Sequence, residues 1–220
     1  MSRLAGVADR ETSLKRARLW LACGVAMPFL YAATLLLAGL LHPGYSHFAQ
    51  APSELGAAGV RFSRVFNTGM VATAVATIAG GFGLALGLRQ LGAGALLAVM
   101  TGGSMALLGI SLAMAGLFPL PSPLHHGFGL TLAGLLTPLL GALAWRRIGG
   151  AGAFPGVLML AFIACMALLA INLGAGGLIA RTNAGLWPRA LAVVCFPSIG
   201  LLCWRTACHL VPGAPAAPPA

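Results

Sequence analysis

The chain alternates between long apolar stretches and short segments that carry nearly all of its charged side chains. A helix that rises about 1.5 Å per residue needs about 20 apolar residues to cross a hydrocarbon core roughly 30 Å thick. Such stretches run over residues 19–41, 67–88, 91–118, 126–145 and 187–204, and a further one lies within residues 156–179. Their apolar residues are continuous rather than alternating, which is typical of helices and not of a membrane barrel. The pattern predicts an all-α polytopic membrane protein with six transmembrane helices.

Composition supports the same fold class. The chain is 59% hydrophobic and 7% charged, whereas a soluble domain is about 25% charged. Lys and Arg number 13 against 3 Asp and Glu, for a net charge of +10. Most of these basic residues flank the apolar stretches, so they are explained as topology signals, and nucleic acid is not an expected partner.

The basic residues also predict an orientation. With the N-terminus inside, the cytoplasmic segments hold Arg3, Arg10, Lys15, Arg16, Arg18, Arg89, Arg146, Arg147 and Arg205, and the outer segments hold Arg61, Arg64, Arg181 and Arg189. Because cytoplasmic connections carry the excess of Lys and Arg, we expect both termini to be cytoplasmic. The expected location is a cell membrane, the inner membrane of a bacterium.

Three regions follow from this division. Residues 1–18 form a basic cytoplasmic segment, residues 19–208 the transmembrane domain, and residues 209–220 a Pro/Ala-rich disordered tail. A cleaved signal peptide is the competing interpretation of the first stretch, because Ala49-Gln50-Ala51 resembles a cleavage site. We reject it, since the apolar run is roughly 23 residues long and exceeds a signal h-region.

Glycine and proline mark contacts and kinks inside the spans. Gly83 and Gly87 form a GxxxG motif, and Gly102, Gly103 and Gly109 give the third span a small-residue face. Such faces serve packing within the chain or, alternatively, a homodimer. Pro28 and Pro138 are expected to kink the first and fourth spans, with neighbouring groups bonding the freed carbonyls.

The polar residues outside the termini gather in the outer loops. After Glu11 the chain has a single carboxylate, Glu54, and Pro52 is positioned to open a short helix with Glu54 in its first turn. In the next outer loop, Ser122-Pro123 is typical of a helix start and puts His125 in the first turn. Adjacent residues of a helix point about 100° apart, so we expect only one of His125 and His126 to face a given site.

We therefore predict a polar pocket centred on Glu54 on the extracytoplasmic face. Its predicted ligand-binding residues are Tyr45, His47, Ser53, Glu54, Asn67, His125, His126 and Arg181. Candidate catalytic residues are Glu54 and His126, and candidate metal ligands are His47, His125 and His126. Three interpretations stay open: an ion pair between Glu54 and Arg61, Arg64 or Arg181, a ligand site without metal, and a metal or haem site. The sequence specifies no cofactor, and it contains no nucleotide-binding fingerprint.

A family resemblance accompanies these motifs. Tyr45-Ser46-His47, Ser53-Glu54-Leu55-Gly56, Asn67, Phe118-Pro119 and His125-His126 together resemble the domain-of-unknown-function 998 family. The resemblance covers about residues 20 to 205 and implies six-helix prokaryotic membrane proteins without an assigned reaction. Members often carry an acid soon after Phe-Pro and a Glu-Arg pair before the sixth helix, where this chain has Leu120-Pro121 and Ala180-Arg181. The resemblance therefore implies that this chain keeps the binding pocket of the family but lacks any chemistry that depends on those acids.

Our leading hypothesis is a binding protein for a lipid headgroup or small amphiphile, with membrane lipids as partners. The alternatives are a membrane-embedded, metal-assisted lipid hydrolase or transferase, and a small transporter.

Overall fold

The computed structural model of the protein describes residues 2–150 and 152–210. The α-helices are α1 (Ser2–Leu41), α2 (Ser63–Gln90), α3 (Ala95–Leu117), α4 (Leu130–Gly134), α5 (Thr137–Ile148), α6 (Phe154–Asn172) and α7 (Leu186–His209). Short 3₁₀ helices are η1 (Pro52–Gly56), η2 (Pro123–Gly129) and η3 (Ala175–Gly177). Within the described residues no strand occurs, and 6 helical segments are long and apolar enough to cross a membrane. The predicted all-α, six-span fold is confirmed.

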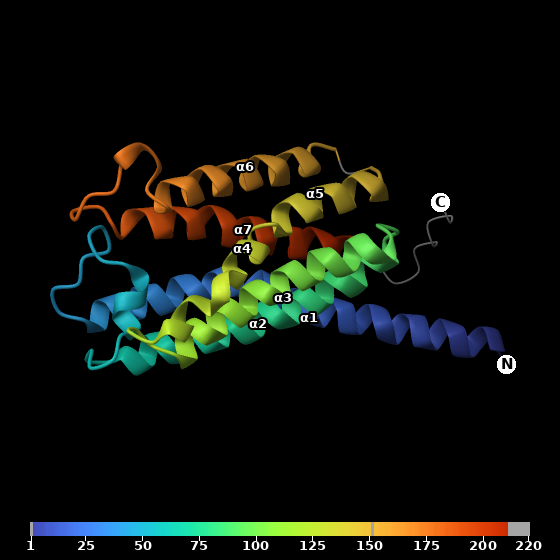
Figure 1. Cartoon of the computed structure of the whole chain (residues 1–220). Coiled ribbons are helices and arrows are strands. Elements are labelled where there is room, and N and C mark those ends of the chain that lie inside the picture. The colour runs from blue at the N-terminus through green and yellow to red at the C-terminus, as the bar shows by residue number, and fades with distance from the viewer. Residues whose placement is uncertain (1, 151, 211–220) are drawn as a thin grey trace.

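The helices lie lengthwise beside one another and define two ends of a bundle (Figure 1). One end, the loop end, carries the connections from α1 to α2, from α3 to α4 and from α6 to α7. At the other end, the terminal end, α1 begins and α7 finishes. Helix α2 packs against α1 and α3, and α7 packs against α1 and α6.

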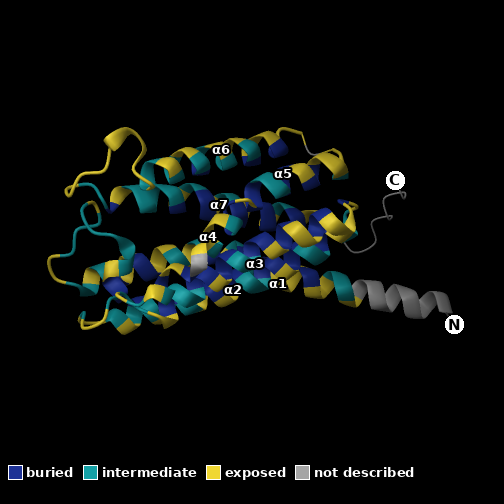
Figure 2. Ribbon diagram, in the orientation of Figure 1, coloured by how far each residue is buried: buried dark blue, intermediate teal, exposed yellow. Residues whose placement is uncertain are grey.

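Small residues bring the central helices together. A Cβ on Gly80 of α2 would lie 2.6 Å from the Cα of Gly24 in α1, and one on Gly83 would lie 2.6 Å from the backbone nitrogen of Leu21. A Cβ on Gly81 would lie 2.6 Å from the carbonyl oxygen of Gly102 in α3. These faces therefore pack within the chain, while a homodimer stays a prediction. Burial is greatest where α1, α2, α3 and α7 meet (Figure 2).

The fourth span breaks where Pro138 was expected to kink it. Helix α4 ends at Gly134 and α5 begins at Thr137. Pro138 has no N–H for the Gly134 carbonyl, and the Thr137 hydroxyl donates to that oxygen instead at 2.7 Å. The Ser104 hydroxyl of α3 donates to the neighbouring Ala133 carbonyl at 2.9 Å. Side chains thus bond the carbonyls at the break, as membrane burial requires.

The observed helix ends can be set beside the predicted boundaries. The fifth span is predicted within residues 156–179, and α6 begins at Phe154 and ends at Asn172, because Gly174 adopts a positive φ angle of 97° just after it. Helix α1 runs from Ser2, so the predicted boundary after residue 18 falls inside one continuous helix. Helix α7 continues to His209, and residues 211–220 of the predicted tail lie outside the described residues.

Candidate functional site

The first connection, residues 42–62, folds over the loop end and contains the short helix expected at Pro52. In η1 the Glu54 side chain accepts a hydrogen bond from the Ala51 N–H at 2.8 Å through Oε1. Its Oε2 accepts a second from Gln50 Nε2 at 3.1 Å. Glu54 is exposed and bonds these two neighbours rather than an arginine. The carboxylate therefore caps η1, and the ion pair with Arg61, Arg64 or Arg181 that the sequence left open does not form.

Arg189 of α7 holds this connection in place. Its Nη1 donates to the carbonyl oxygens of Gln50 and Gly185, each at 2.7 Å, and its Nη2 donates to the Tyr45 hydroxyl. The Tyr45 hydroxyl in turn donates to the Ala51 carbonyl oxygen at 2.9 Å. Sequence reasoning placed Arg189 only at the end of a span. The signal that could have found it is its position, because an arginine inside an apolar helix needs partners.

Burial and Arg189 set the protonation of the neighbouring rings. Burial raises the pKa of Tyr45, which outweighs the lowering effect of the Arg189 charge, so the phenol stays neutral. Burial, and then the positive charge of Arg189, lower the pKa of His47 below its ordinary 6.5. The imidazole is therefore neutral at pH about 7. Arg189 is the permanent charge of this cluster.

Close packing fixes the connection against α2 and α7. The Asn67 amide of α2 donates to the Gly56 carbonyl oxygen at 3.1 Å, and a Cβ on Gly56 would collide with Asn67 Oδ1. Gly185 donates its N–H to the Phe48 carbonyl oxygen at 2.8 Å. A Cβ on Gly185 would collide with the Gln50 carbonyl oxygen. Glycine is required at both places because a backbone or amide group occupies the space.

Beneath this connection lies a cavity of about 270 Å³, which we call the inner cavity. It is lined by α1, η1, α2, α3, η2, α4 and α7, and most of the lining side chains are apolar, among them Phe66, Leu112 and Phe196. Glu54 is not among the lining residues. We expected a polar pocket centred on Glu54, and the structure instead has an apolar cavity with Glu54 on the surface above it.

His125 is the buried member of the histidine pair. Ser122 caps η2 by accepting from the Leu124 N–H at 3.3 Å, as the Ser-Pro motif predicted. His125 is 6% exposed, and its Nδ1 lies 3.0 Å from the Phe118 carbonyl oxygen. A carbonyl only accepts, so Nδ1 carries the proton and Nε2 is left for another partner. His126 is exposed, so only one of the two rings faces the cavity, as expected.

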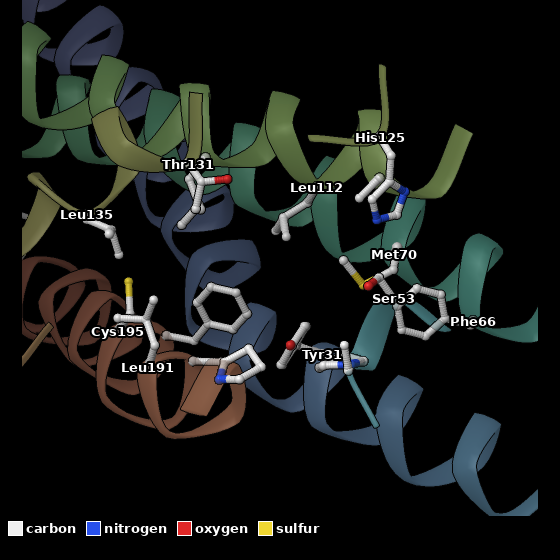
Figure 3. Close-up of a pocket in the computed structure, with 17 residues that line it drawn as sticks. Tyr31, Ser53, Phe66, Met70, Leu112, His125, Thr131, Leu135, Leu191 and Cys195 are labelled. Atoms are coloured by element: carbon white, nitrogen blue, oxygen red, sulfur yellow. The ribbon is translucent and has the colours of Figure 1, made fainter. Parts of the chain in front are cut away.

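The polar groups of the inner cavity form one set. Tyr31, Ser53 and His125 all line it, from α1, η1 and η2 (Figure 3). Among residues 12–150 and 152–210, no side chain or backbone group hydrogen-bonds the Tyr31 hydroxyl, the Ser53 hydroxyl or His125 Nε2. These groups are available to a bound molecule. Sequence reasoning missed Tyr31, although a tyrosine amid an apolar helix is a polar group that needs a partner.

A second cavity of about 370 Å³ lies between α1 and α7, and we call it the lateral groove. His47 and Arg189 line it together with apolar side chains of the two helices. Tyr31, Ala192 and Phe196 line both cavities, and the rings of Tyr31 and Phe196 meet edge to face at 4.5 Å. His47 and His125 thus belong to different cavities.

The remaining predicted residues fall outside both cavities. His126 and Arg181 are exposed, and Arg181 lies in the connection before α7. In the described part of the chain, no group of three or more His, Cys, Asp or Glu side chains has an arrangement that could hold a metal ion. The structure therefore does not bring together His47, His125 and His126, the predicted metal ligands.

A protein-family model, DUF998 (protein of unknown function), matches residues 25–205. The chain belongs to this family. No curated protein and no solved structure matches it significantly. The segments that suggested DUF998 all lie at the loop end: Tyr45-Ser46-His47, Ser53-Glu54-Leu55-Gly56, Asn67, Phe118-Pro119 and His125-His126. In this DUF998 protein, Ser53 and His125 of these segments line the inner cavity, and Tyr45 bonds Arg189.

Proposed function

We propose that this membrane protein binds an amphiphilic molecule with an uncharged polar head in the inner cavity. The observation that carries the proposal is an apolar cavity lined by the Tyr31 hydroxyl, the Ser53 hydroxyl and His125 Nε2, none of which has a hydrogen-bond partner among the described residues. Ligand pockets are mostly apolar with a few convergent polar groups, which matches this composition. A hydrocarbon chain would lie along α3 and α7, and the head would bond the three polar groups.

The setting favours a ligand from the membrane. The bundle has six membrane-spanning helices, and the inner cavity adjoins the lateral groove through the shared residues Tyr31 and Phe196. Lipid-like molecules are thus the most abundant candidates beside it. We place the loop end on the extracytoplasmic face of a bacterial inner membrane, following the distribution of Lys and Arg.

Photocrosslinking tests the proposal. The probe is a monoacylglycerol with a diazirine in its acyl chain, added to the detergent-purified protein. We expect crosslinks on cavity-lining residues such as Leu112 and Leu191, and we expect Ala115→Phe to abolish them by filling the cavity. Crosslinks confined to lipid-facing side chains and unchanged by Ala115→Phe would refute the proposal. Release of free fatty acid during incubation would instead favour the hydrolase alternative.

The polar groups can be tested without disturbing the fold. Tyr31→Phe and Ser53→Ala each remove a hydroxyl that bonds no protein group, so thermal stability in detergent should be retained. Each should weaken probe binding by about threefold to tenfold, the value of one hydrogen bond. Thr68→Val, at an exposed position of α2, is the matched control and should leave binding unchanged.

A further inference from the structure

The lateral groove runs between α1 and α7, and each helix lines it with a stripe of residues spaced four apart. Pro28, Ala32 and Leu36 line it from α1, and Arg189, Val193 and Pro197 line it from α7. Residues four apart lie on the same face of a helix, so each stripe is continuous. Its volume of about 370 Å³ falls within the roughly 300–1,000 Å³ range of small-molecule sites.

The groove is open sideways toward the space that lipid tails occupy. Val193 is 71% exposed and Leu36 is 60% exposed, although both belong to apolar membrane spans. From Arg189 to Pro197 the helix advances about 12 Å, at about 1.5 Å per residue. A single leaflet of the hydrocarbon core is about 15 Å thick, half of roughly 30 Å. The groove therefore extends through most of one leaflet.

Toward the terminal end the two helices close on each other. A Cβ on Gly24 of α1 would lie 2.5 Å from Cys203 Sγ of α7. One on Gly200 would lie 3.1 Å from Cγ of Pro28. The lateral groove is thus closed on the terminal side of Pro28 and open on the loop side. An acyl chain that occupies the groove must therefore have its polar head at the loop end, beside Arg189 and His47.

Arg189 brings to that end a positive charge that no carboxylate of the described residues bonds directly. After Glu11 the only carboxylate in the chain is Glu54, and it bonds Gln50 and the Ala51 N–H instead of Arg189. The partners of the guanidinium are two carbonyl oxygens and the Tyr45 hydroxyl, all of them neutral. A partly buried cation that forms no ion pair within the protein favours an anionic ligand.

The guanidinium also has a donor to offer. It has five N–H donors, and its contacts within the protein use two on Nη1 and one on Nη2. Nε is buried and has no acceptor in the described part of the chain, so the donor left for a ligand is the second N–H of Nη2. A charge-assisted hydrogen bond from this N–H to a phosphate oxygen is stronger than one between neutral groups.

We propose that the lateral groove is a binding site for an anionic phospholipid of the surrounding leaflet. The phosphate pairs with Arg189, one acyl chain lies between α1 and α7, and the other remains in the bilayer through the open side of the groove. A net anionic head is favoured because the site offers a cation and no carboxylate for an ammonium group. This site adjoins the inner cavity, with which it shares Tyr31, Ala192 and Phe196, but it does not depend on the function proposed for that cavity.

Native mass spectrometry of the protein in detergent tests this site with phosphatidylglycerol and phosphatidylcholine as probes. We expect one phosphatidylglycerol to be retained in preference to phosphatidylcholine. Arg189→Gln should weaken phosphatidylglycerol binding by about tenfold or more, the effect of losing a charge-assisted contact. Arg181→Gln removes an equal charge from the exposed connection before α7 and should have no effect. Equal binding of the two lipids to the unmodified protein would overturn the proposal.

Because Arg189 also holds the first connection, a second variant tests the groove alone. Val193→Trp fills the lateral groove from an exposed position and leaves the guanidinium contacts in place. It should therefore abolish the preference for phosphatidylglycerol over phosphatidylcholine. Val75→Trp, on the lipid-facing side of α2 and 62% exposed, is the matched control and should retain it. If Val193→Trp keeps the preference for phosphatidylglycerol, the lateral groove is not the lipid site.

The monoacylglycerol crosslinking separates the two proposals. In Val193→Trp we expect the inner-cavity crosslinks to persist while the phosphatidylglycerol preference disappears. A different outcome is that crosslinking fails in every form of the protein while the phosphatidylglycerol preference still depends on Arg189 and Val193. That outcome would support the phospholipid site in the lateral groove and refute the function proposed for the inner cavity.

Discussion

At the scale of single residues, Arg189 joins segments that are far apart in the chain. It donates to the Gln50 carbonyl, and it reaches the Ala51 carbonyl through the Tyr45 hydroxyl. Backbone carbonyls in a partly buried connection need donors, and one guanidinium supplies several of them. Glu54, the residue most prominent in the sequence, has the more local task of capping η1.

Substitution of Gly185 should loosen this arrangement. In Gly185→Ala the new methyl group would collide with the Gln50 carbonyl oxygen, so the first connection must move away from α7. We expect the free energy of unfolding to fall by about 1–3 kcal/mol, which is typical of overpacking. Thermal unfolding in detergent measures it. Gly156→Ala in α6, where a Cβ meets nothing within 4 Å, is the control, and an equal loss there would contradict the explanation.

His47 should make the stability depend on pH. Burial and Arg189 lower its pKa in the folded protein, whereas the unfolded chain keeps the ordinary value of 6.5. Below pH 6.5 the unfolded state therefore binds more protons than the folded state, so this contribution is complete above that pH and is lost as the pH falls through the lowered pKa.

A comparison with His47→Gln isolates this effect from the other histidines. Between about pH 7.5 and about pH 5, the unfolding temperature of the unmodified protein should fall further than that of the variant. Parallel curves for the two proteins would show that His47 does not carry the pH dependence.

At the scale of elements, the broken fourth span shapes the inner cavity. Thr131 of α4 and Leu135 just after it line the cavity, while α5 turns toward α6 beyond the break (Figure 1). The break remains stable in a membrane because the hydroxyls of Thr137 and Ser104 bond the carbonyls of Gly134 and Ala133.

A pair of variants tests this account of the break. Thr137→Val leaves the Gly134 carbonyl without its hydroxyl donor and should lower the free energy of unfolding by about 1–2 kcal/mol. In a Pro138→Ala background residue 138 has an N–H that can serve that carbonyl, so the same substitution should cost less. Chemical unfolding of the four proteins in detergent measures the difference. An undiminished cost in the Pro138→Ala background would contradict the account.

At the scale of the whole molecule, polar and charged groups divide between the two ends. The loop end holds the folded connections and both cavities' polar residues, whereas the terminal end holds short connections with basic residues such as Arg89, Arg146 and Arg147. Since cytoplasmic segments are enriched in Lys and Arg, the loop end is predicted to face outward.

Reporter fusions test that orientation. A reporter that is active only outside the cytoplasm should be active when fused after Ala49, in the first connection of the loop end. The same reporter fused after Gly92, between α2 and α3, should be silent. The reverse pattern would invert the topology and move the ligand sites to the cytoplasmic leaflet.

The sequence by itself determined the features that depend on local chemistry. The lengths of the apolar runs predict the spans, and the missing N–H of Pro138 predicts a kink at the place where the fourth span breaks. Pro52 and Ser122 predict the starts of η1 and η2. These follow because helix length, proline geometry and capping involve residues close together in the chain.

Only the tertiary structure decided which polar groups meet. Glu54 bonds its own neighbours, while Arg189 crosses to residues 45 and 50, and Tyr31, Ser53 and His125 from three segments line one cavity. Such contacts depend on how the helices cross and rotate. A stripe of glycine and alanine is compatible with several crossing angles and rotations, so the sequence does not determine them. Packing around Gly24, Gly80, Gly81 and Gly102 selects one of them, and with it the cavity and the groove.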